Sequence, residues 1–75
     1  MADKRQETQA LGRAIREVRV ERGFAQDAFA AHAGMDRSYF GAIERGEFNV
    51  TYLTILKIAR GLGVRPSELM LRAGL

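Results

Sequence analysis

The residues of this chain that could take part in chemistry are polar side chains at the start of a predicted helix. Asp36 is suited to the N-cap of that helix, because its carboxylate can accept hydrogen bonds from the free amides of the first turn, and Arg37 follows it directly. An exposed arginine at this place can donate two hydrogen bonds to O6 and N7 of guanine, for about 1–3 kcal/mol of discrimination. Read alone, such an arginine is more often a solvated surface side chain, so its role depends on the elements around it.

The chain lacks the residue types from which most catalytic and metal sites are built. It contains no cysteine, a single histidine (His32), no glycine-rich phosphate loop and no pairing that suggests a nucleophile and its base. A histidine without a partner in the sequence is typical of an exposed helix position rather than of a metal ligand. We therefore expect a protein that is not an enzyme and has no metal site and no cofactor.

Length and composition predict one small globular domain. The chain has 75 residues, of which 47% are hydrophobic and 28% charged, and this leaves no room for a second core. A domain this short and without cysteine gains only marginal stability from its own core, which favours oligomerisation. The net charge of +3 is compatible with nucleic-acid binding but is common among other proteins. Because there is neither a signal-peptide pattern nor a long apolar run, we expect a cytoplasmic protein that does not contact a membrane.

Apolar residues recur at helical spacing along most of the chain, and no strand pattern competes with them. We expect an all-α fold in which residues 1–7 form a flexible, polar N-terminal arm and residues 8–75 form a compact five-helix domain. Glycines mark several of the expected helix ends, and Pro66 suits the first turn of the last helix. The predicted helices cover about residues 8–22, 26–33, 37–45, 52–62 and 66–75.

The same spacing predicts which side chains face the core. The predicted core residues are Leu11, Ile15, Val18, Phe24, Phe29, Phe40, Ile43, Leu56 and Leu62. In the fourth predicted helix the apolar row is Tyr52, Leu53, Leu56, Ala59 and Leu62. Gly61 lies inside this helix, where a glycine costs about 1 kcal/mol relative to alanine.

The second and third predicted helices form a helix-turn-helix. They are joined by a tight turn at residues 33–36 that contains Gly34, and Ala30 is small at the place where the two helices must approach closely. Two short helices joined in this way leave one face of the second helix free to point outward. We therefore interpret the segment from Gln26 to Gly46 as a DNA-binding motif.

These residues resemble the Cro and phage-repressor family of helix-turn-helix proteins, also called the xenobiotic-response-element family. The resemblance is carried by Gln26, Ala30, Gly34, Phe40 and Ile43, with the sequence IERG at residues 43–46, and it covers roughly Leu11 to Leu69. Residues 36–46 and 49–64 are also similar to the controller proteins of restriction-modification systems. The resemblance implies a lambda-repressor-like domain of five helices, a homodimer, and a third helix that enters the major groove of a double-stranded DNA operator.

Carried over residue by residue, the resemblance also implies roles for individual side chains. The candidates for contact with base edges are Arg37, Ser38, Tyr39 and, one turn further on, Ala42. The candidates for contact with the DNA backbone are Gln26, Arg45, Asn49, Thr51 and Tyr52. Arg19 and Glu44 match a pair of positions that form a salt bridge beneath the recognition helix, although each could equally be a solvated charge.

The fifth predicted helix carries consecutive apolar residues, which cannot all face the core of so small a domain. We expect a homodimer whose interface is built from this helix and the adjoining end of the fourth helix. The candidate interface residues are Val64, Leu69, Met70, Leu71 and Leu75. The expected function is a dimeric transcription regulator that reads an inverted repeat and has no small-molecule ligand. The alternative is an antitoxin-like module whose fifth helix holds another protein and whose DNA contact is secondary.

Overall fold

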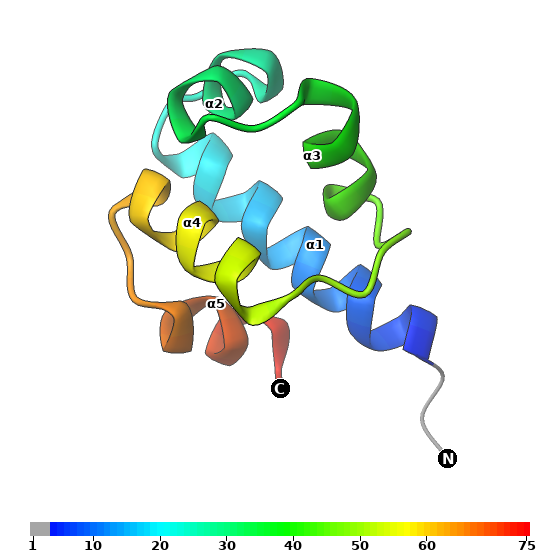
Figure 1. Ribbon diagram of the computed structural model, residues 1–75. Helices are drawn as coiled ribbons and strands as arrows, with labels where there is room; N and C mark the ends of the chain where they lie inside the picture. The colour runs from blue at the N-terminus through cyan, green and yellow to red at the C-terminus, as the bar shows by residue number, and fades with distance from the viewer. Residues whose placement is uncertain (1–3) are drawn as a thin grey trace.

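The computed structural model describes residues 4–75, and this part of the chain consists of five α-helices without a strand (Figure 1). Their bounds are α1 Lys4–Glu21, α2 Gln26–Ala33, α3 Arg37–Glu44, α4 Tyr52–Leu62 and α5 Pro66–Ala73. The predicted all-α, five-helix class is therefore confirmed. None of these helices is long and apolar enough to cross a membrane.

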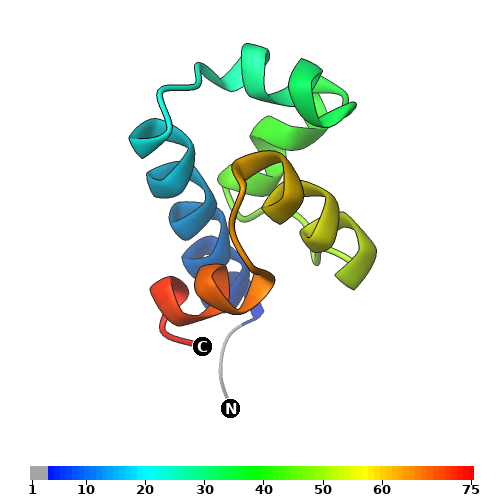
Figure 2. The same ribbon diagram turned by 90° about the vertical axis from the view of Figure 1, so that its left-hand side faces the viewer.

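The long helix α1 is the element around which the others pack. It contacts α3, α4 and α5, while α2 packs on α3 and α4. Figures 1 and 2 show α2 and α5 at opposite ends of the molecule, with α1 and α4 between them. The largest fully buried side chains are Ile15, Val18, Phe29, Phe40, Ile43, Ile58 and Leu69. The predicted core of the first three helices is therefore correct, except that Phe24 is only partly buried.

The predicted inward face of α4 is correct at Ala59 and Leu62 and wrong at its other positions. The helix buries Ile55, Ile58, Ala59 and Leu62, which lie at the i, i+3, i+4 and i+7 positions of one face. Leu53 is instead 74% exposed, Tyr52 is also exposed, and Leu56 is only half-buried. Apolar residues occupy two adjacent faces of α4, so apolar spacing alone is compatible with either face packing against the core. The face that packs is the one that contains Ile55 and Ile58.

Helix α1 begins before the residue that the apolar spacing indicated. Residues 4–7, part of the predicted flexible arm, are helical, while residues 1–3 of that arm lie outside the described residues. Glu7 lies in the first turn, where a negative charge favours the helix dipole. The hydroxyl of Thr8 donates to the carbonyl of Gly46 at 2.7 Å, which holds this end of the helix against the α3–α4 loop. The turn is exposed, so it carries no apolar pattern.

Helix α5 turns one of its predicted interface residues into the core. Leu69 is fully buried, so it stabilises the single chain and is not available to a partner. Val64 and Met70 pack partly against the same core, whereas Leu71 and Leu75 are exposed. An exposed ion pair between Arg72 and Glu21 ties α5 to α1, with 2.6 Å between Nη1 and Oε2. Only one side of α5 can meet α1, and Leu69 lies on that side.

Two glycines allow the helices to cross closely. A Cβ at Gly12 would lie 2.4 Å from the carbonyl oxygen of Glu44 and 2.5 Å from that of Ile43, so α1 meets the end of α3 with no side chain between. A Cβ at Gly61 would lie 2.9 Å from Cζ of Phe29, at the crossing of α4 and α2. The close packing of Phe29 therefore requires a glycine at position 61, although glycine lowers the helix propensity of α4.

We predict that Gly12→Ala lowers the free energy of unfolding by about 1–3 kcal/mol, because the obstructing atoms are backbone and cannot turn aside. Urea denaturation followed by circular dichroism measures the effect. Arg13→Ala is the matched control, since Arg13 is the exposed neighbour on the same helix. A Gly12→Ala midpoint equal to that of the control would show that α1 and α3 do not need this close approach.

Candidate nucleic-acid interface

The turn between α2 and α3 has the local structure that the residue types indicated. Gly34 ends α2 in the left-handed conformation, with φ of 70°, and Met35 donates its amide to the carbonyl of Ala30 at 2.8 Å. Asp36 caps α3, because its Oδ2 accepts the amide hydrogen of Tyr39 at 2.9 Å. The predicted N-cap is therefore confirmed, and Arg37 is the first residue of α3.

One hollow on the surface brings together the outer face of α3 and the start of α2. Arg37, Gly41 and Arg45 follow one another at four-residue intervals along α3, and Ser38 lies beside them. Gln26 lines the hollow from α2. Gly41 is itself buried, with the side chains of Gln26 and Arg45 beside it. The polar groups that this hollow offers to an anionic or polar ligand are therefore the side chains of Arg37, Ser38 and Arg45.

Two of the predicted base-contacting residues are placed differently. Ala42 is only 6% exposed and belongs to the core, because it lies one position past the outer row of α3. The outer row continues at Gly41, which sequence reasoning set aside because it has no polar reach. Tyr39 is partly exposed, but its ring packs edge-on against Phe48 of the following loop, with the ring centroids 5.2 Å apart.

The predicted backbone-contacting residues after α3 lie at the surface. Asn49 is exposed in the α3–α4 loop, and Tyr52 is exposed in the first turn of α4. Thr51 is the N-cap of α4, since its hydroxyl accepts the amide hydrogen of Thr54 at 3.2 Å. Sequence reasoning missed this cap, although a threonine directly before an apolar helical run is a recognised start signal.

Behind α3 lies a buried ion pair between Arg19 of α1 and Glu44 of α3. Arg19 Nε is 2.7 Å from Glu44 Oε2 and its Nη2 is 3.1 Å from Oε1, and the two side chains are 9% and 2% exposed. The remaining guanidinium nitrogen donates to the carbonyl of Phe24 at 2.8 Å. Gln26 Nε2 donates to Glu44 Oε1 at 2.8 Å. The expected pair is thus formed, shielded from water and supported by two further hydrogen bonds.

The side-chain amide of Gln26 therefore has a structural partner. Its nitrogen is engaged by Glu44, and its oxygen lies 3.2 Å from the place that a Cβ at Gly41 would occupy. This arrangement sets the start of α2 against the outer face of α3. The side chain is half-buried, so one edge remains at the surface of the hollow.

A comparison with known families agrees with this geometry. The sequence model of the helix-turn-helix domain family matches residues 12–75, which is most of the chain. The chain therefore belongs to the helix-turn-helix family.

Relatives within that family narrow the resemblance. The chain is 39% identical over 60 residues to control protein C.MunI of a Mycoplasma species, a match that covers 79% of this chain and 81% of that protein. It is 35% identical over 61 residues to control protein C.BamHI of Bacillus amyloliquefaciens, covering 80% of this chain and 75% of that protein. The similarity to controller proteins that residues 36–46 and 49–64 indicated is confirmed by these matches.

A solved structure shares both the fold and much of the sequence. The restriction-modification controller protein C.AhdI from Aeromonas hydrophila superposes with a TM-score of 0.80 at 42% identity, over 83% of this chain and 94% of that one. The structure of the controller protein C.Esp1396I superposes with a TM-score of 0.80 at 27% identity, over 89% of this chain and 86% of that one.

We predict that Arg19→Met, which removes the charge but keeps most of the side-chain length, destabilises the fold by about 3–5 kcal/mol, because Glu44 is left buried and unpaired. Urea denaturation measures the loss. Arg72→Met is the control, since it breaks an exposed ion pair and should have a much smaller effect. Adding Glu44→Leu to Arg19→Met should restore part of the stability, because no buried charge is then left. Equal losses for the two single variants would contradict the argument.

Proposed function

We propose that this chain is a transcription regulator that binds an inverted-repeat DNA operator as a homodimer, with α3 of each copy in the major groove. The observation that carries the proposal is the outer face of α3, where Arg37 and Ser38 project beside a glycine while the opposite side is fixed by the buried Arg19–Glu44 pair. A recognition helix needs an outward polar face, and the rest of the domain must hold the helix in a fixed orientation. The function proposed is binding and not catalysis, in the cytoplasm where the operator lies.

Sequence discrimination in this proposal comes first from Arg37. It lies at the exposed start of α3, where family members place base-reading side chains, and its guanidinium can meet O6 and N7 of guanine. Ser38 adds one donor and acceptor beside it. Gly41 adds no side chain between Arg37 and Arg45 and is itself buried, so discrimination is left to its neighbours. Tyr39 contributes less reach, because its ring is packed on Phe48.

Contacts with the DNA backbone flank α3 in this proposal. Gln26 stands at the N-terminus of α2, and Tyr52 follows the Thr51 cap at the N-terminus of α4. Helix N-termini carry free amides and partial positive charge, which suit a phosphate group. Asn49 lies in the loop between α3 and α4 and can donate through its side-chain amide. These contacts would fix register without reading the sequence.

Selection of bound duplexes from a random library tests the function directly. The expected result is an inverted repeat whose half-sites are centred about one helical turn, or ~34 Å, apart, because two-fold symmetry relates the two α3 helices. The absence of any enriched sequence would contradict sequence-specific binding. Enrichment of a single half-site without its inverted copy would contradict the dimer.

A protein-interaction module of the antitoxin type remains the second candidate, and the observation that favours it is a second apolar surface. Leu53 is exposed at the start of α4 and, with Leu56 and Ala33, forms the apolar part of a groove between α4 and α2. This groove is separate from the exposed leucines of α5, and its other lining residues are His32, Lys57, Arg60 and Gly61. One homodimer interface on α5 would leave this groove uncovered. Purification from the source cells with a stoichiometric second protein, and no enriched duplex, would favour this function.

We predict that Arg37→Ala lowers affinity for the selected operator by about 1–3 kcal/mol and relaxes preference at one base pair in each half-site. Titration of operator and scrambled duplexes measures both effects. Arg16→Ala is the matched control, because Arg16 is an exposed arginine on α1 and does not line the hollow at α3. Equal losses on the operator and on the scrambled duplex would mean that Arg37 contacts phosphate only.

We predict that Leu71→Glu converts the dimer to a monomer at micromolar concentration, because Leu71 is the most exposed leucine of α5 and a buried glutamate at a two-fold interface would face its own copy. Leu75 is exposed as well, whereas Val64 and Met70 are partly buried against the core. Sedimentation velocity measures the change. Leu53→Glu is the matched control on α4. A dimer that survives Leu71→Glu but is lost in Leu53→Glu would move the interface to the groove between α2 and α4.

A further inference from the structure

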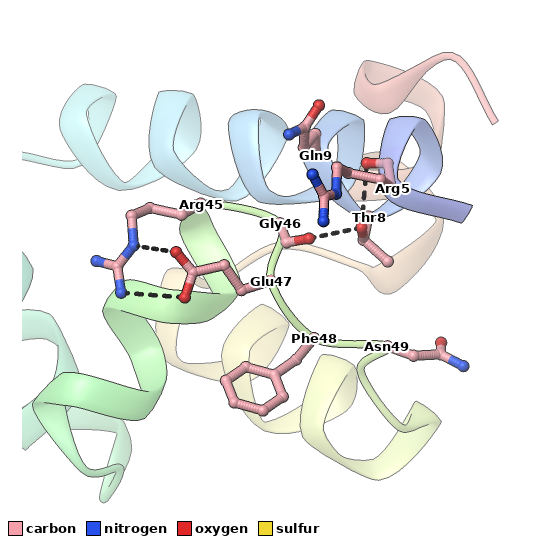
Figure 3. A pocket seen from close by; sticks show the side chains of 8 residues that line it. All are labelled: Arg5, Thr8, Gln9, Arg45, Gly46, Glu47, Phe48 and Asn49. Atoms are coloured by element: carbon pink, nitrogen blue, oxygen red, sulfur yellow. Dashed lines mark hydrogen bonds and ion pairs between the residues drawn. The ribbon is translucent and has the colours of Figure 1, made fainter. Parts of the chain in front are cut away.

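Arg45, at the end of α3, is held in an extended position over the recognition surface by the loop that follows it. Its Nε donates to Glu47 Oε2 at 2.7 Å, and its Nη2 is 3.4 Å from Oε1 (Figure 3). Its Nη1 lies 3.3 Å from the place that a Cβ at Gly41 would occupy, so the guanidinium extends back one turn along α3. In Figure 3 this third nitrogen points away from Glu47. A side chain at position 41 would crowd this end of Arg45.

The carboxylate that holds Arg45 is itself set on an anchored loop. The amide of Glu47 donates to the carbonyl of Ala42 at 3.0 Å, which closes the end of α3. The carbonyl of Gly46 accepts the hydroxyl of Thr8 at 2.7 Å, and a Cβ at Gly46 would lie 2.5 Å from Cα of Gln9. On the other side, Phe48 packs against the ring of Tyr39. The loop backbone is therefore held by both α1 and α3, which places Glu47 beside Arg45.

The charge and hydrogen-bond geometry show which edge of Arg45 is available. The hydrogen bond and the positive charge of Arg45 lower the pKa of Glu47, so its carboxylate is ionised at neutral pH. Glu47 occupies the side of the guanidinium formed by Nε and Nη2, and Nη1 keeps both of its hydrogens at the outer end. A phosphate placed against the same guanidinium would meet the negative charge of Glu47, whereas the uncharged edge of a base pair would not.

We propose that Arg45 reads a second base pair of the operator and that Glu47 is the positioning residue that aims it. This assignment rests on the proposed DNA-binding function and replaces the expected phosphate contact of Arg45. The outer end of the guanidinium donates to acceptors on a guanine edge in the major groove. The ion pair with Glu47 restricts the Arg45 side chain before DNA binds. This lowers the conformational entropy that Arg45 loses on binding.

The spacing along α3 sets where that second base pair lies. Arg37 and Arg45 are separated by two turns, or about 12 Å at ~1.5 Å per residue, and the side chain of Arg45 returns by about one turn. With ~3.4 Å between successive base pairs, the second contact falls about two to four base pairs from the one read by Arg37. Each half-site therefore contains two arginine-dependent positions, one at each end of the hollow.

The experiment measures binding of the wild type, Arg37→Ala, Arg45→Ala and Glu47→Gln to a set of operators with every single base-pair change. We expect Arg45→Ala to lose preference at one base pair, by roughly five- to one-hundred-fold, at a position distinct from that lost in Arg37→Ala. Glu47→Gln should weaken preference at the same position as Arg45→Ala and leave the Arg37 position unchanged. Glu68→Gln, at an exposed site on α5, is the control for loss of one negative charge.

The salt dependence of binding gives an independent readout. A base-reading Arg45 already neutralised by Glu47 contributes little to counterion release, so Arg45→Ala should keep the slope of log affinity against log salt nearly unchanged. A phosphate contact would instead lower that slope by about one and weaken all duplexes alike. That result, or a Glu47→Gln variant that binds every duplex more tightly with unchanged base preference, would overturn the proposal.

The binding results distinguish the proposed DNA-binding function from the role proposed for Arg45. A wild-type protein that prefers no duplex overturns the proposed function and this assignment together. A wild type with a clear operator, whose preferences at every position survive both Arg45→Ala and Glu47→Gln, overturns only this assignment. Circular dichroism verifies that the variants are folded, which is expected because Arg45 and Glu47 are both exposed.

Discussion

The geometry of the recognition surface depends on the buried pair of Arg19 and Glu44. Taking two charges out of water costs several kcal/mol each, and this cost is offset only when the remaining donors and acceptors are also satisfied. Here Arg19 makes three hydrogen bonds and Glu44 accepts a further one from Gln26, and no polar side-chain atom buried within residues 5–75 lacks a partner. These bonds join α1, the start of α2 and the end of α3. The pair therefore fixes the angle between α1 and α3 as well as stabilising the fold. A rotation of α3 would separate the two charges, which have no alternative charged partner.

Close backbone contact makes this pair possible. A carboxylate at the end of α3 can meet an arginine of α1 in the interior only if the two helices cross without intervening side chains, and Gly12 provides that crossing. At a second crossing, between α2 and α4, Gly61 leaves room for the ring of Phe29. Leu69 completes the packing from α5. In a chain of this length the core cannot absorb a shift of one helix, so small residues at the crossings and large ones beside them determine the fold together.

The sequence predicts the features that follow from local chemistry and misses those that depend on how helices rotate. The Asp36 cap and the turn at Gly34 are specified by residue type and position alone, and five helices follow from apolar spacing. The Arg19–Glu44 pair could be predicted only through family resemblance, since two charges separated by 25 residues carry no local signal. The sequence does not predict which face of α4 packs inward, that Leu69 is buried, or that Ala42 points into the core. In each case the helix has apolar residues on more than one face. Tertiary packing selects among those faces, and periodicity does not.

In the proposed function, the outer face of α3 has few side chains with which to discriminate between base pairs. Gly41 and the buried Ala42 remove two positions from direct contact, which leaves Arg37, Ser38 and the buttressed end of Arg45. With so few donors, each one must be held in place, because a mobile arginine satisfies many base pairs equally well. The mounting of α3 on α1 and the anchoring of the loop by Thr8 both restrict that freedom. Any remaining specificity in the proposed function must come from the shape and deformability of the DNA.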